Sequence, residues 1–295
     1  MRFSETTKGY LFVFISVIAL SNVYIFSKVA LSEVHFLQFG VYWFFFAFIW
    51  NLLLFFSSNK FRQEITLNKK NLSYLPVLGI LELLSTGLFF YAIKLVENPT
   101  IISFISNIGP IYIIILGFIF LKERFNKWEI TGIFITIIGA VILNYNKDFS
   151  WGSFFFNGIG FIFLSSFIFA ISSVLAKSKI KSIHPWLLTI NRIIFIFTGF
   201  LVLFLINKED IYISHKAFYN ILLGSLLGPF LAVLTGYYSF KYIKVSKISV
   251  LGTSKSFFIL AASYFFFNTI PTTFQIIGGT LMIAGVITIV SSKRK

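Results

Sequence analysis

Apolar runs of about 20 residues recur along the whole chain, and the polar connections between them are short. A helix needs about 20 apolar residues to cross the hydrocarbon core of a bilayer, because each residue advances it by only about 1.5 Å. The pattern therefore predicts an all-α integral membrane protein without a soluble domain. We expect ten transmembrane helices, over residues 9–31, 36–58, 72–95, 99–121, 127–145, 152–177, 184–206, 217–240, 248–267 and 273–292.

The composition excludes a soluble fold. Hydrophobic residues make up 57% of the 295 residues and charged residues only 12%, and the mean hydropathy is +0.89. A soluble domain carries about 25% charged residues, so an aqueous fold could not cover this much apolar surface. Much of the surface must face lipid, and the bilayer is the first expected partner.

The basic residues predict the orientation. With a cytoplasmic N-terminus, eighteen of the 25 lysines and arginines fall in cytoplasmic segments, five in outer segments, and two, Arg192 and Lys255, within spans. This bias follows the positive-inside rule. We expect a multi-pass protein of the cell (inner) membrane with both termini cytoplasmic. Topology thus explains the net charge of +15, and nucleic acid is not an expected partner.

The two halves of the chain align with each other. A shift of 149 residues superimposes His35 on His184, and a shift of 146 later superimposes Gly132 on Gly278 and Gly139 on Gly285. We predict two repeats, 1–147 and 148–295, each with five spans. Since five is odd, the second repeat enters the membrane inverted, the arrangement from which many carriers build alternating access around a midplane site.

Four segments carry a resemblance to a known family. They are Ser21–Lys28 in the first span, Ile108–Tyr112 in the fourth, Leu121–Phe125 after it, and Gly132–Gly139 in the fifth. With the two five-span repeats, they resemble the signatures of EamA-type transporters of the drug/metabolite transporter superfamily, over nearly the whole chain. The resemblance implies a carrier for amino acids, other small metabolites, sugar phosphates or nucleotide sugars. Many relatives carry an arginine early in the second span, where this chain has Tyr42-Trp43.

Three charged residues stand out because they lie well inside spans, away from the span ends, where charge is costly and usually functional. Arg192 and Lys255 are candidates to attract a carboxylate or phosphate, and Glu82 is a candidate for substrate or proton coupling. The resemblance implies that helices three, seven and nine, which carry them, border a central cavity. Alternatively, Glu82 pairs with one cation as structural glue while the other cation reaches for the interface.

Other polar and aromatic residues in or near spans complete the predicted substrate site. Ordinary roles compete with this prediction, because Ser and Asn also hydrogen-bond between helices and Tyr and Trp also form interfacial belts. The additional candidates are Asn22, Trp43, Tyr91, Asn107, Asn191, Tyr237 and Ser254.

Catalysis and metal binding are not expected. The chain has no cysteine, and its three histidines lie far apart, at span edges or in loops. Only one carboxylate lies in the middle of a span, so an aspartyl-type pair is absent. We predict no enzyme, no catalytic residue, no metal and no cofactor. The glycines of helices five and ten predict close packing, either within the bundle or at a homodimer contact.

The predicted function is therefore secondary transport, the export of small metabolites such as amino acids by alternating access. Two alternatives stay open, a flippase for lipid-linked carriers and an exchanger of anionic metabolites such as nucleotide sugars.

Overall fold

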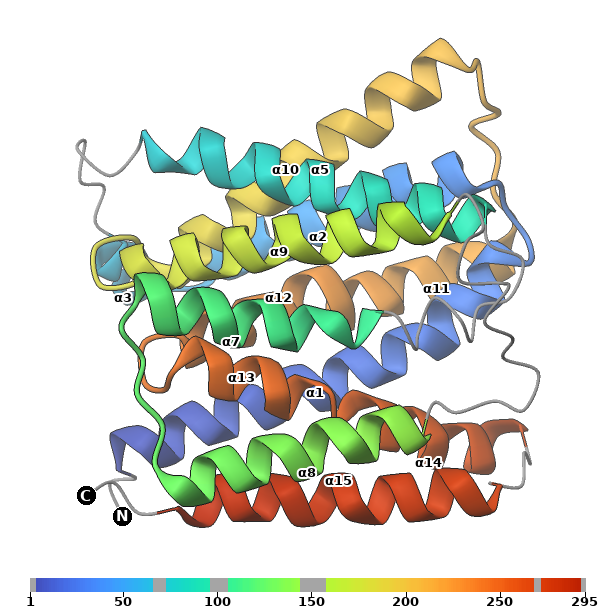
Figure 1. The fold of residues 1–295 in the computed structure, drawn as a ribbon. Coiled ribbons are helices and arrows are strands. Elements are labelled where there is room, and N and C mark those ends of the chain that lie inside the picture. Colours follow the sequence, from blue (N-terminus) through green and yellow to red (C-terminus); the bar gives the residue numbers. More distant parts are fainter. Residues whose placement is uncertain (1–3, 66–72, 96–105, 144–157, 268–271, 293–295) are drawn as a thin grey trace. The chain divides into compact units, whose positions relative to one another are not determined.

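The computed structural model describes residues 4–65, 73–95, 106–143, 158–267 and 272–292, and within them the chain forms helices and turns but no strand (Figure 1). In chain order the helices are α1 (Glu5–Leu31), α2 (Phe36–Ser57), α3 (Asn59–Glu64), α5 (Tyr74–Leu95), α7 (Ile108–Phe120), α8 (Lys127–Leu143), α9 (Ile159–Lys179), α10 (Pro185–Ile206), α11 (His215–Ser225), the π-helix η2 (Leu226–Ala232), α12 (Val233–Ser239), α13 (Val245–Gly252), α14 (Lys255–Phe267) and α15 (Thr273–Ser291).

Every predicted span contains helix within the described residues, so the all-helical class is confirmed. Within the described ranges, six helical stretches are long and apolar enough to cross a membrane. They are Glu5–Val23, Phe36–Ser57, Gly160–Lys179, Pro185–Ile206, His215–Ser239 and Thr273–Ser291. The short helix α3 was not predicted; the hydroxyl oxygen of Ser58 caps it by accepting a 3.3 Å hydrogen bond from the Phe61 backbone N–H.

The eighth predicted span is not a uniform α-helix. Its middle, η2, is a π-helical turn that contains Pro229. Proline has no N–H to donate and its ring crowds the preceding turn, so the regular ladder cannot continue through it. The Ser16 hydroxyl of α1 donates a 2.6 Å hydrogen bond to the Ala232 carbonyl at the end of this turn. The chain at Pro229 thus forms a wide π-helical turn that is hydrogen-bonded to α1, and such turns are often found at functional sites.

The ninth predicted span is interrupted. α13 ends at Gly252 and α14 begins at Lys255. Between them, the hydroxyls of Thr253 and Ser254 donate back to the carbonyls of Val250 and Leu251, at 2.7 and 2.6 Å. Such bonds compete with the helical ladder, and the preceding glycine adds backbone freedom. The span predicted over 248–267 is therefore helical on both sides of a turn at Thr253 and Ser254.

The helices form two compact units by contact. The first contact unit comprises Met1–Leu83 and Ala176–Tyr242, and the second comprises Leu84–Leu175 and Ile243–Lys295. In the first, α1 packs against α11, η2 and α12, and α2 packs against α10. In the second, α8 packs along α15, and α7 contacts α13. This grouping differs from the sequence repeats 1–147 and 148–295, which stay a prediction.

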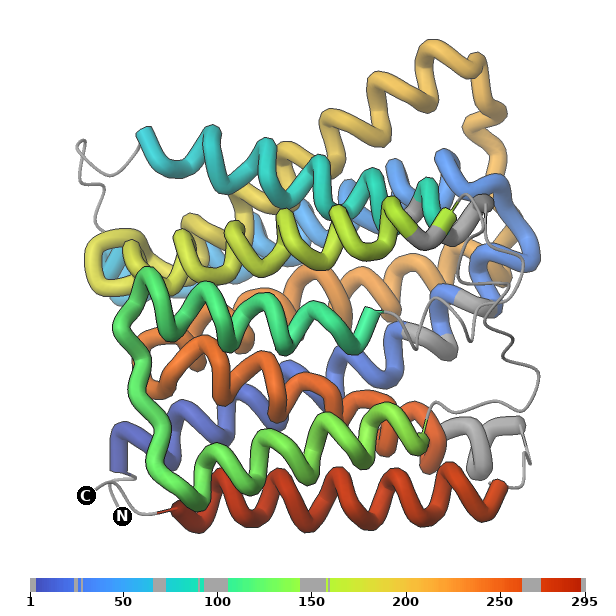
Figure 2. Tube along the Cα trace, in the orientation of Figure 1, coloured from blue at the N-terminus to red at the C-terminus, as the bar shows by residue number. Residues whose placement is uncertain are grey.

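The contact between α8 and α15 confirms the predicted glycine packing. A Cβ atom at Gly139 would lie 2.7 Å from the Gly278 carbonyl oxygen, and one at Gly132 would lie 2.9 Å from the Gly285 carbonyl oxygen. Real Cβ atoms essentially never come under 3.0 Å, so only glycine permits this backbone approach. The two helices run side by side in Figures 1 and 2.

We expect Gly278→Val to destabilise the protein by about 1–3 kcal/mol or more, because a side chain there would meet the backbone of Leu143 and Gly139. Thermal unfolding of the purified protein measures the effect. Gly160→Ala is the matched control, since a Cβ atom at Gly160 meets nothing within 4 Å. A melting temperature for Gly278→Val equal to that of the control would contradict the packing argument.

Candidate functional site

A buried ion pair joins two helices of the first contact unit. The guanidinium of Arg192, on α10, forms an ion pair with the carboxylate of Glu82, on α5. Glu82 is only 2% exposed. The Tyr237 hydroxyl, on α12, donates a 3.4 Å hydrogen bond to the other carboxylate oxygen of Glu82. The structure thus brings together three of the predicted site residues, which we call the triad (Glu82, Arg192 and Tyr237).

A neighbouring contact fixes α10 against α5. The side-chain amide of Asn191 donates a 2.8 Å hydrogen bond to the Leu75 carbonyl. This bond joins the two helices that carry Arg192 and Glu82. Asn191 was predicted to line the substrate site, and its position assigns it at least this positioning role.

The triad is electrically balanced but not saturated with hydrogen bonds. One carboxylate and one guanidinium sum to no net charge. The Arg192 Nε is buried and donates to no group in the described part of the chain. Guanidinium offers five N–H donors in a planar fork, so the triad retains a donor that a carboxylate or carbonyl oxygen could accept from.

Two other predicted residues of the first contact unit have packing roles. Trp43, on α2, is buried. Its ring packs against two glycines: a Cβ atom would lie 2.3 Å from the ring at Gly224 and 3.3 Å from it at Gly228. It therefore packs beside the π-helical turn. Asn22, on α1, donates a 2.8 Å hydrogen bond to the Ile18 carbonyl of its own helix.

The remaining predicted residues belong to the second contact unit. Tyr91 is 50% exposed and packs edge-on against Phe161. The side-chain nitrogen of Asn107 is buried without a hydrogen-bond partner among the described residues. Lys255 forms no ion pair with a described residue. The hydroxyl of the buried Ser254 donates to the Leu251 carbonyl in the last turn of α13.

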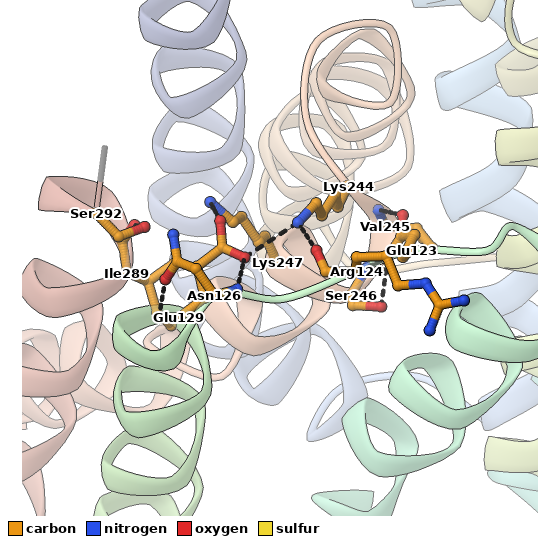
Figure 3. A network of polar contacts seen from close by, with 10 residues as sticks. All are labelled: Glu123, Arg124, Asn126, Glu129, Lys244, Val245, Ser246, Lys247, Ile289 and Ser292. Atoms are coloured by element: carbon orange, nitrogen blue, oxygen red, sulfur yellow. Dashed lines mark hydrogen bonds and ion pairs between the residues drawn. The ribbon is translucent and has the colours of Figure 1, made fainter. Parts of the chain in front are cut away.

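A second polar network lies where α13 begins (Figure 3). The carboxylate of Glu123, in the α7–α8 connection, accepts from the backbone N–H groups of Val245 and Ser246 at 2.8 and 3.2 Å. It also accepts from the Ser246 hydroxyl at 2.6 Å. The first N–H groups of a helix lack partners within it, so Glu123 caps α13 from a distant part of the chain.

Glu129 holds the same helix through two lysines. Its carboxylate lies 2.6 Å from the Lys247 Nζ and 3.0 Å from the Lys244 Nζ. Glu129 also closes a capping box at the start of α8: its backbone N–H donates to the Asn126 side chain, and its carboxylate accepts from the Asn126 backbone. Glu129 is 2% exposed, so two buried carboxylates hold α13: Glu123 from the α7–α8 connection and Glu129 from the first turn of α8.

This network could not be predicted as a unit from local sequence patterns. Glu123 lies in a segment that carries only the family resemblance, and Lys244 and Lys247 are among the basic residues that predict the orientation. Their contacts join residues more than a hundred positions apart, which no local pattern reveals. One local signal was present: Asn126 followed three residues later by Glu129 is typical of a helix start.

No group of three or more His, Asp or Glu side chains in the described ranges could hold a metal ion. The buried charged groups of the triad and of the network at the start of α13 instead form ion pairs and helix caps. Their chemistry suits recognition of a polar solute and anchoring of helices.

Comparisons with known proteins place this geometry in context. The sequence pattern described as the EamA-like transporter family matches the chain twice, over residues 7–145 and 156–291. An uncharacterized transporter of Haemophilus influenzae is 27% identical over 237 residues, 75% of each chain. An uncharacterized transporter of Archaeoglobus fulgidus is 26% identical over 125 residues, and this chain spans only 44% of its length. A crystal structure of another protein matches with a TM-score of 0.78 over 96% of both chains at 14% identity, a likeness of fold alone.

Proposed function

Because this chain belongs to the EamA-like transporter family of the drug/metabolite transporter superfamily, it is a membrane transporter, and we propose that it exports small metabolites such as amino acids by alternating access. The proposal places ten spans in the inner membrane as two inverted five-helix repeats, 1–147 and 148–295, with both termini in the cytoplasm.

The glycine contacts between α8 and α15 support the inverted repeats. Gly132 packs against Gly285, and Gly139 packs against Gly278. The repeat alignment equates Gly132 with Gly278 and Gly139 with Gly285, so exchanging the repeats turns one contact into the other. Two contacts that interchange when the repeats are exchanged are expected for a twofold-symmetric interface between the repeats. The contacting pairs run in opposite directions along the chain, as expected for repeats related by an axis in the membrane plane.

The caps at equivalent positions add to this support. The same shift of 146 residues carries Asn126 and Glu129 onto Thr272 and Gln275. The second pair forms its own capping box at the start of α15. The shift of 149 residues relates His35 and His184, which are the N-cap residues of α2 and α10.

One observation carries the substrate part of the proposal, namely the triad within three apolar helices. An ion pair among apolar helices is expensive to bury, and intramembrane charges usually mark a solute pathway. The triad has no net charge, and the Arg192 Nε donates to no described residue. A substrate with a carboxylate or carbonyl oxygen and little net charge suits it better than a polyphosphate.

One observation favours an exchanger of anionic metabolites as the second candidate. Lys255 has no ion-pair partner among the described residues and lies at the interruption between α13 and α14. An unpaired cation there would favour a phosphate or carboxylate group. The two candidates differ in the net charge of the preferred solute.

A ligand screen on the purified full chain separates these functions. Amino acids, sugar phosphates, nucleotides and lipid-linked sugars are tested for a rise in melting temperature, because a ligand at a hundred times its Kd stabilises by about 2.7 kcal/mol. Active classes then enter counterflow assays in proteoliposomes. Amino acids should stabilise the protein and exchange. Activity with phosphates alone would favour the exchanger, activity with lipid-linked sugars the flippase, and no counterflow with any class would reject transport of these solutes.

A further inference from the structure

Charges alternate between the interior and the surface from the α7–α8 connection into the first turn of α8. Lys122, Arg124 and Lys127 are exposed, whereas the carboxylates between and after them, Glu123 and Glu129, are buried. The segment carries nearly balanced charge in sequence, but its acidic groups face inward and its basic groups face outward.

The buried carboxylates are already engaged and cannot neutralise the exposed cations. Glu123 accepts the N–H groups at the start of α13, and Glu129 binds Lys244 and Lys247 (Figure 3). The three exposed cations form no ion pair with any described residue. Their charge therefore remains available to a partner outside the chain.

Exposed aromatic side chains flank these cations. Phe120, at the end of α7, is 70% exposed, and Trp128, in the first turn of α8, is 69% exposed. The Arg124 guanidinium lies 5.2 Å from the centre of the Phe118 ring. Tryptophan is enriched at the headgroup level of bilayers, so the cations lie beside groups that suit the membrane interface. We call Phe120, Lys122, Arg124, Lys127 and Trp128 the cationic ridge.

One residue of the cationic ridge, Lys122, has a backbone conformation that is unfavourable for lysine. Lys122 has a φ of 54°, in the left-handed region. Left-handed backbone is costly for residues other than glycine and, less so, asparagine or aspartate. A lysine at this turn gives up backbone stability but gains an exposed cation, which is consistent with a functional role for its side chain.

We propose that the cationic ridge binds the phosphodiester headgroups of anionic phospholipids in the cytoplasmic leaflet. Basic groups near a membrane surface attract anionic lipids, and the flanking aromatic rings insert at the acyl boundary. The leaflet assignment rests on the proposed orientation. The lipid preference itself does not depend on which solute is transported.

Fluorescence quenching tests the proposal on the full chain. The protein is reconstituted in phosphatidylcholine vesicles that contain 20% brominated phosphatidylglycerol or, in a parallel sample, 20% brominated phosphatidylcholine. Subtracting the signal of a Trp128→Phe variant isolates quenching at Trp128. Phosphatidylglycerol should be enriched at Trp128 by up to about fivefold for each engaged cation at low salt. The enrichment should shrink in ~0.5 M NaCl, because salt at that concentration screens the attraction between exposed charges.

The decisive variant is Lys122→Gln/Arg124→Gln/Lys127→Gln, which should lose the enrichment. Its matched control, Lys60→Gln/Arg62→Gln/Lys181→Gln, removes three other exposed cations and should keep it. Arg124→Gln alone should lose part of the enrichment, and it provides the test where the triple variant does not fold.

Three results would overturn the proposal. They are equal quenching by the two brominated lipids, equal loss in both triple variants, and full competition by 10 mM inorganic phosphate, on the order of a weak free-phosphate site. The first would leave an acidic protein as the partner, and the last a free anion. A protein without counterflow that still shows the enrichment would reject transport of the tested solutes and leave the lipid proposal standing.

Discussion

Glu82→Gln and Arg192→Gln, each made alone, are expected to lower the stability of the protein by about 3–5 kcal/mol, because each leaves the opposite charge buried without its partner. The double variant should recover much of this loss, since two neutral amides bury no charge and can hydrogen-bond to each other. Thermal unfolding of the wild type, the two single variants and the double variant in detergent gives the coupling free energy between Glu82 and Arg192.

The double variant also separates the two roles considered for the triad. If the ion pair only holds α5 to α10, the double variant regains both stability and transport. If Arg192 contacts the substrate, the double variant regains stability but transports at less than about a hundredth of the wild-type rate, the loss expected for a charge-assisted contact of about 3 kcal/mol. Counterflow in proteoliposomes measures this, and wild-type transport by the double variant would reject the substrate role.

Tyr237→Phe is the matched control for this series. It removes only a hydroxyl whose hydrogen bond to Glu82 is long, at 3.4 Å, and it keeps the ring. We expect a stability loss of about 0.5–1.5 kcal/mol and retained transport. A loss as large as that of Arg192→Gln would mean that the hydroxyl, rather than the ion pair, is the essential group.

Local patterns predicted the helices well because membrane helices satisfy their hydrogen bonds internally. Apolar length alone predicted ten spans, each of which contains helix among the described residues, and six helical stretches there are long and apolar enough to cross a membrane. The glycines at positions 132, 139, 278 and 285 predicted the α8–α15 contact. The interruption at Thr253 and Ser254 escaped prediction, because their hydroxyls can bond back to the chain in an intact helix as well as in a broken one.

The candidate site was predictable only in part, since its geometry depends on contacts far apart in sequence. The free-energy cost of placing a charge inside an apolar span singled out Glu82 and Arg192. A pairing of Glu82 with one cation was one of the two roles considered. The position of Tyr237 beside them could not be derived from a local pattern. Trp43 looked equally suitable, but its ring packs against Gly224 and Gly228. The second network was missed because surface-like residues, such as Lys247, turn out to be buried.

Glu129→Gln is expected to release α13 from the first turn of α8. The substitution removes both ion pairs and leaves Lys247, which is only 8% exposed, buried without this carboxylate. Losing one side of a buried pair costs about 3–5 kcal/mol. Hydrogen exchange should therefore speed up at the amides of α13, including those of Val245 and Ser246, while the amides of α2 exchange at an unchanged rate.

Lys127→Gln is the control for Glu129→Gln, because Lys127 lies in the same helical turn but is exposed and unpaired within the described chain. The free energy of unfolding of the Lys127→Gln variant should differ from that of the wild type by less than about 0.5 kcal/mol. Glu123→Ala should show an intermediate loss of about 1–2 kcal/mol, the usual value of a helix cap, with faster exchange confined to the first turn of α13. If Glu129→Gln behaved like Lys127→Gln, the two ion pairs would contribute no anchoring, and the Glu123 cap alone would hold α13.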